Sequence, residues 1–92
     1  MFTWLNSQAV RSDLGFEVES IDRDSIAYRE GAIRLDVEVE NGFVGSKPCV
    51  IFSRRSFDLA GGKSVSTAER DRMVKNFSDA MEFQGLAVVI ED

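Results

Sequence analysis

The segment from Ile33 to Glu40 alternates apolar and charged residues without interruption, and no other feature constrains the fold as strongly. Successive side chains of a β-strand point to opposite sides of the sheet, so a strand here has one apolar and one charged face. The charged face carries Asp36, Glu38 and Glu40. Because an antiparallel sheet can leave one face in water, the pattern predicts an exposed acidic face that suits a basic partner.

Length and composition predict a single domain over residues 1–92. A chain of 92 residues with 43% apolar residues can bury a modest core of two layers. The start lacks a basic leader followed by an apolar run, and no segment of about eighteen apolar residues occurs. We therefore expect a cytoplasmic protein without membrane contact. The one cysteine, Cys49, lies in an apolar run and is expected to be a packed thiol.

The net charge of −5 is concentrated in the first half of the chain. Residues 1–46 hold nine acids and four bases, whereas residues 47–92 hold seven of each. Such an excess of carboxylates repels nucleic acid, whose backbone is also negative. The charge pattern favours a protein partner.

Alternation and turn residues predict several strands. Residues 16–21 and 25–30 alternate on either side of a polar turn, which is typical of a hairpin. Asn41-Gly42 is the strongest two-residue turn signal, and a second glycine at Gly45 suggests a somewhat longer loop. An apolar strand is predicted over residues 47–53. The first fourteen residues show no clear period and are expected to form a short helix or an irregular arm.

One long helix is predicted in the second half of the chain. Ser66 and Glu69 fit a capping box at its start, and Gly85 suits a left-handed residue just past its end. An apolar stripe at three- and four-residue spacing consists of Met73, Val74, Phe77, Ala80 and Met81. A final apolar strand is predicted over residues 86–90.

These elements predict an α+β fold. The helix should cover one face of a mostly antiparallel sheet of four to five strands, a β-meander, followed by the last strand. The opposite face would then expose Glu17, Glu19, Asp36, Glu38 and Glu40. The strands over residues 49–52 and 86–90 are apolar on both sides, so either the arm with Trp4 and Leu5 or a second copy of the chain should cover them.

The composition argues against an enzyme. The chain has no His, which removes the most common general base near neutral pH and the His-ligated metals. Asp22, Asp24 and Glu30 do not fit the calcium-loop pattern, because no glycine stands at its sixth position. No catalytic residue, metal ligand or cofactor is predicted.

A loop over residues 54–64 offers a possible anion site. Gly61-Gly62-Lys63-Ser64 lies between a strand and a helix but lacks the first glycine of a phosphate-binding loop, since Phe57 stands there. The bases near this loop are Arg54, Arg55, Lys63, Arg70 and Arg72. An anion-binding domain is therefore kept as an alternative.

The order of these segments resembles a known family. The segment Ile26 to Gly31, an alternating strand ending in Glu40, the apolar Val50 to Phe52, the helix start Ser66 to Arg70, and Phe83 to Gly85 occur in turn. Over residues 20–90 this order resembles the seventy-fourth numbered family of bacterial polymorphic-toxin immunity proteins (immunity protein 74). Members carry Trp and Pro after the fourth strand, where this chain has Phe57 and Asp58.

The resemblance implies a non-catalytic protein that binds and neutralises a cognate toxin inside the producing cell. A basic toxin such as a nuclease would suit the acidic face. We expect partner contacts at Glu17, Glu19, Asp36, Glu38 and Glu40, and at Phe57 as an aromatic anchor. A small acidic secretion chaperone or adaptor is the other alternative, and the chain is expected to be a monomer or a homodimer.

Overall fold

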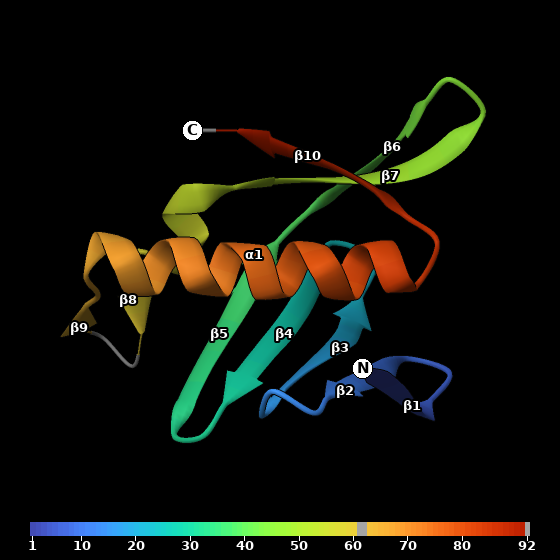
Figure 1. Cartoon of the computed structure of the whole chain (residues 1–92). Coiled ribbons are helices and arrows are strands. Elements are labelled where there is room, and N and C mark those ends of the chain that lie inside the picture. Colours follow the sequence, from blue (N-terminus) through green and yellow to red (C-terminus); the bar gives the residue numbers. More distant parts are fainter. Residues whose placement is uncertain (61–62, 92) are drawn as a thin grey trace.

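A computed structural model describes residues 1–60 and 63–91, and its first sheet confirms the predicted meander (Figure 1). Five antiparallel strands lie side by side in chain order. They are β1 (Phe2–Asn6), β2 (Ala9–Ser12), β3 (Phe16–Asp22), β4 (Ser25–Glu30) and β5 (Ile33–Glu38). The alternating segment follows its expected pattern in β5, where Leu35 and Val37 are buried and Asp36 and Glu38 are exposed.

A second sheet begins one residue after the first one ends. Only Val39 separates β5 from β6 (Glu40–Val44), which pairs antiparallel with β7 (Lys47–Ser53). The last strand, β10 (Ala87–Glu91), pairs in parallel with β7. A parallel pair needs a long crossover connection, and the helix supplies it. Sequence patterns predicted the last strand but not this separate mixed sheet.

The segment between β7 and the helix contains short elements. A 3-10 helix, η1 (Arg54–Phe57), follows β7 directly, and the two-residue strands β8 (Leu59–Ala60) and β9 (Lys63–Ser64) pair with each other. The predicted loop therefore holds local structure. Its Gly61-Gly62 pair lies outside the described residues.

The predicted helix is confirmed as α1 (Thr67–Phe83). The Ser66 hydroxyl accepts the backbone N–H of Glu69 at 3.1 Å, as expected of an N-cap. Gly85 has a φ of +86°, a left-handed conformation that glycine adopts without steric cost. Both ends of the helix thus follow from local chemistry.

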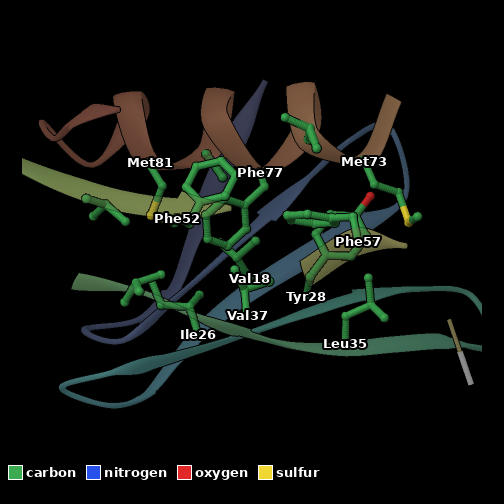
Figure 2. Packing of buried hydrophobic residues seen from close by; sticks show 14 of the residues in the cluster. Val18, Ile26, Tyr28, Leu35, Val37, Phe52, Phe57, Met73, Phe77 and Met81 are labelled. Carbon is green, nitrogen blue, oxygen red and sulfur yellow. The ribbon is translucent and has the colours of Figure 1, made fainter. Parts of the chain in front are cut away.

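The core lies between α1 and the two sheets (Figure 2). The Phe77 ring on α1 meets the rings of Phe52 and Phe57 at centroid distances of 4.8 and 5.6 Å. The Tyr28 ring on β4 lies 6.0 Å from that of Phe57. Aromatic contacts therefore join the helix, η1 and strands of both sheets. Within the described part of the chain, no helix has the length and apolar character that a membrane crossing requires.

The prediction for the first fourteen residues is wrong, because they form the β1–β2 hairpin. Val10 of β2 pairs with Val18 of β3 and joins the core, so cross-strand pairing organises a segment with little local pattern. Trp4 remains half-exposed, and its ring packs on Phe83 at 6.0 Å. The hairpin extends the edge of the first sheet and does not shield β7 and β10 as expected.

The turn predicted at Asn41-Gly42 is also wrong. Both residues belong to β6, where Asn41 pairs with Val50 and its side-chain amide donates to the Arg23 carbonyl at 2.9 Å. The chain turns at residues 45–46 instead, with Gly45 at a φ of +63°. Pairing with β7 and with the β3–β4 turn therefore outweighs the local turn preference of Asn-Gly.

Candidate functional site

The outer face, defined as the side of both sheets that points away from α1, carries the acids singled out in the sequence. Glu17 and Glu19 alternate on β3 with core residues, and Asp36 and Glu38 do the same on β5. Glu40 continues the alternation at the start of β6. Glu17, Glu19, Asp36 and Glu38 therefore share the side of the first sheet that points away from α1, and Glu40 lies in the second sheet, next to Glu38 around one cleft.

Arginines of the same face neutralise the two acids on β3. The register places Glu17 between Arg11 and Arg29, with Nη–Oε distances of 2.7 and 3.6 Å. Glu19 also pairs with Arg29. All these groups belong to neighbouring antiparallel strands, so the pairs are built into the register. Glu17 and Glu19 thus already have cationic partners within the chain.

Asp36 has a weaker local partner. Its carboxylate lies 3.6 Å from the Arg34 guanidinium on the same strand, and both side chains are exposed. An exposed pair of this kind contributes little free energy, because water and salt screen it. Asp36 can therefore exchange Arg34 for a group of a partner.

Glu38 and Glu40 line a cleft at the junction of the two sheets. The cleft has a volume of about 350 Å³, and its lining includes the carboxylate residues Asp24, Glu38, Glu40 and Glu91. Neither Lys nor Arg is among the described residues that line it. The backbone N–H of Val39 donates to the Asp24 carbonyl at 2.9 Å, which holds the β3–β4 turn against the start of β6.

Among the described residues, ion pairs balance little of the charge that lines this cleft. Within residues 1–60 and 63–91, the side chains of Glu38, Glu40 and Glu91 form no ion pair, and Asp24 reaches only its exposed neighbour Arg23 at 3.5 Å. Carboxylates of one sign around a concave site add their potentials and attract cations. The cleft is therefore the part of the outer face best suited to receive a Lys or Arg side chain.

Sequence reasoning missed two of the four carboxylates. Asp24 lies in a predicted turn and does not fit a calcium loop, and Glu91 follows an apolar strand without any distinguishing pattern. Glu91 reaches the cleft because β10 pairs in parallel with β7, which sets Glu91 beside Ser53. No local signal specifies that pairing.

The expectation of a surface contact at Phe57 is wrong. Its side chain is fully buried and packs against the rings of Phe52, Tyr28 and Phe77. The 3-10 helix η1 turns this residue inward from the end of β7. Phe57 stabilises the core and is not available to a partner.

The basic side chains near the predicted loop do not act as one cluster. The Arg70 guanidinium lies 3.5 Å from the carboxylates of Asp58 and Asp71, and Arg72 pairs with Glu30. Arg70 and Arg72 are thus paired with acids of the same chain. This pairing disfavours an anion site at the loop.

Comparisons with known proteins assign the chain to no group. No protein-family model, no curated protein and no solved structure matches it.

Proposed function

We propose that this chain is a non-catalytic immunity protein that binds and neutralises a basic toxin in the cytoplasm of the cell that makes both. The observation that carries the proposal is the acidic cleft, in which Glu38, Glu40 and Glu91 have no ion-pair partner among the described residues. The resemblance of residues 20–90 to toxin-immunity proteins supports the same function.

The cleft suits the occlusion of a basic active site. A nuclease toxin holds its polyanionic substrate with Lys and Arg side chains. Carboxylates in a concave site can pair with those side chains in place of phosphates, which would block the substrate. Opposite charges also raise the rate at which the two proteins meet.

The contribution of each acid should follow its pairing within the chain. Glu38 and Glu40 offer charge that no base of the described chain neutralises. Glu17 and Glu19 share Arg29, so a partner has to displace that arginine before it gains their full attraction. The cleft acids therefore dominate the proposed contact, and the β3 acids contribute less.

Coexpression tests the proposal directly. Each neighbouring reading frame is expressed alone and together with this chain, and one of them should be lethal alone but harmless in its presence. The charge-reversed variant Glu38→Lys with Glu40→Lys should lose rescue, while Glu17→Gln with Glu19→Gln should keep it. The proposal fails if no frame is rescued and no protein copurifies with the chain.

One observation favours a second candidate, a small acidic secretion chaperone or adaptor. Phe43 and Val44 near the tip of the β6–β7 hairpin are 74% and 54% exposed, and the hairpin projects from the body of the molecule (Figure 1). Exposed apolar side chains of this kind can hold an unfolded segment. Amide hydrogen exchange on the complex separates the two candidates. A copurifying partner that is unfolded would support the chaperone, and a folded partner would support the immunity protein.

A further inference from the structure

The outer face of the second sheet has an apolar middle and oppositely charged ends. Lys47 lies at one end of the central strand β7, and the acids Glu40 and Glu91 lie toward the other end on the neighbouring strands. Cross-strand neighbours on this face follow β7 from the Lys47 end. Lys47 lies beside Val44, and Cys49 lies between Gly42 and Ala87. Ile51 lies between Glu40 and Val89, and Ser53 lies beside Glu91.

The apolar middle of this face is incompletely covered. Val89 is 36% exposed and Val44 is 54% exposed, while Ile51 and Ala87 are half-buried. Gly42 adds no side chain to this face beside Cys49. An apolar strip that is only partly covered is suited to packing against another sheet.

We propose that two copies of the chain pack these faces together about a twofold axis. The axis lies between the two faces and runs at right angles to β7. Such an axis reverses the strand direction across the interface. Lys47 of each copy then meets the Glu40 and Glu91 end of the other copy, while the apolar strips cover each other. Each copy therefore offers the other an apolar strip and charges of opposite sign.

The charges select this orientation over the alternative. An axis along β7 would set Lys47 against Lys47 and the acids against acids, and like charges at close range weaken an interface. The same complementarity favours a second copy over an unrelated protein. Lys47 lies at one end of the apolar strip and Glu40 and Glu91 lie at the other, so an antiparallel copy pairs each charge with its opposite. This inference does not depend on a toxin.

The oligomeric state of the full chain tests the dimer. In sedimentation velocity the unchanged chain should be a dimer, and Val89→Asp, which places a charge on the apolar strip, should be a monomer with an unchanged circular dichroism spectrum. Phe43→Asp is the matched control, because Phe43 lies on the opposite face of β6 and should leave the dimer intact. A chain that remains monomeric up to millimolar concentration overturns the proposal, as does a Val89→Asp dimer.

Charge exchange tests the orientation. Lys47→Glu alone, and Glu40→Lys with Glu91→Lys, should each weaken self-association by more than about tenfold at low ionic strength. Mixing these two variants should restore dimers, because each altered end then meets an opposite charge. If the mixture stays monomeric, the twofold arrangement is wrong.

The dimer and the proposed toxin contact can be separated. Glu40 and Glu91 belong to both surfaces, but Val89 is not among the residues that line the cleft. A monomeric Val89→Asp variant that still rescues cells from the toxin would leave the toxin contact valid without the dimer. A chain that forms the dimer but rescues no cell would leave the dimer valid without the toxin contact.

Discussion

The side-chain amide of Asn76 on α1 donates a hydrogen bond to the Tyr28 hydroxyl on β4 at 3.1 Å. That hydroxyl donates in turn to a carboxylate oxygen of Glu30 at 2.8 Å, and Arg72 of the helix pairs with the other oxygen of Glu30. Tyr28 is fully buried, so its hydroxyl needs these partners. The network fixes the helix at one orientation on the first sheet.

Removing the hydroxyl should lower stability measurably. Tyr28→Phe deprives Asn76 of its acceptor and Glu30 of a donor, while the ring keeps its contacts with Phe16 and Phe57. We expect the free energy of unfolding to fall by about 1–2 kcal/mol, as measured by urea denaturation.

A neighbouring helix residue provides the control. Lys75→Ala breaks an exposed ion pair with Asp79 at 2.8 Å and should cost no more than about 0.5 kcal/mol. Equal losses for Lys75→Ala and Tyr28→Phe would contradict the role of the buried network.

Stability should also decrease at alkaline pH. Burial raises the pKa of the Tyr28 hydroxyl well above its ordinary value, and the nearby Glu30 carboxylate adds to the rise. The folded state therefore keeps this proton at a pH where the unfolded state releases it. The contribution of Tyr28 is complete below about pH 10, the ordinary tyrosine pKa, and is lost as the pH rises further.

The test of this pH dependence uses the fact that the chain has one tyrosine. Tyrosinate absorbance should show no ionisation of the native protein near pH 10 and a normal titration in urea. Tyr28→Phe should show a smaller loss of stability between neutral pH and pH values above about 10 than the unchanged chain. A normal tyrosine titration in the native protein would refute the prediction.

Two glycines of one hairpin should respond to alanine in opposite ways. Gly42 lies in β6 without a left-handed φ, and an added Cβ would make ordinary contacts at 3.5 and 3.6 Å. Gly42→Ala should therefore raise the free energy of unfolding by up to about 1 kcal/mol, since alanine restricts the unfolded chain.

Gly45→Ala should instead destabilise the protein by about 1 kcal/mol, because an alanine at a φ of +63° is strained. Thermal and urea denaturation of both variants measure the difference. If the turn were at Asn41-Gly42, as the sequence alone suggests, the two results would be reversed.

The cleft predicts which acids control association with a basic partner. At low ionic strength, Glu38→Gln with Glu40→Gln should slow binding several-fold, because it removes charge that the described chain leaves unpaired. Glu17→Gln with Glu19→Gln removes the same formal charge but also releases Arg29, so it is the matched control. Stopped-flow measurements at several salt concentrations distinguish them, and an equal effect of both pairs would place the contact elsewhere.

Local sequence patterns correctly predicted the elements in which buried and exposed side chains alternate regularly along the chain. Alternation over Ile33 to Glu40 predicted which side chains of β5 are buried, and the Ser66 cap together with Gly85 predicted both ends of α1. In each case neighbours in the sequence set the hydrogen bonds and the exposed faces. The first hairpin was missed, as was the continuation of β6 through Asn41 and Gly42, because pairing with distant strands decided both.

By itself, the sequence determined that one side of a meander is apolar and the other is charged, because a strand of alternating residues must sort them. Only the tertiary structure decided which acids are neutralised. Cross-strand register sets Arg29 beside Glu17 and Glu19, whereas the β5–β6 bend and the parallel return of β10 bring Glu38, Glu40 and Glu91 around one cleft. Ion pairing depends on distances between strands far apart in the chain, and periodicity along one strand does not encode those distances.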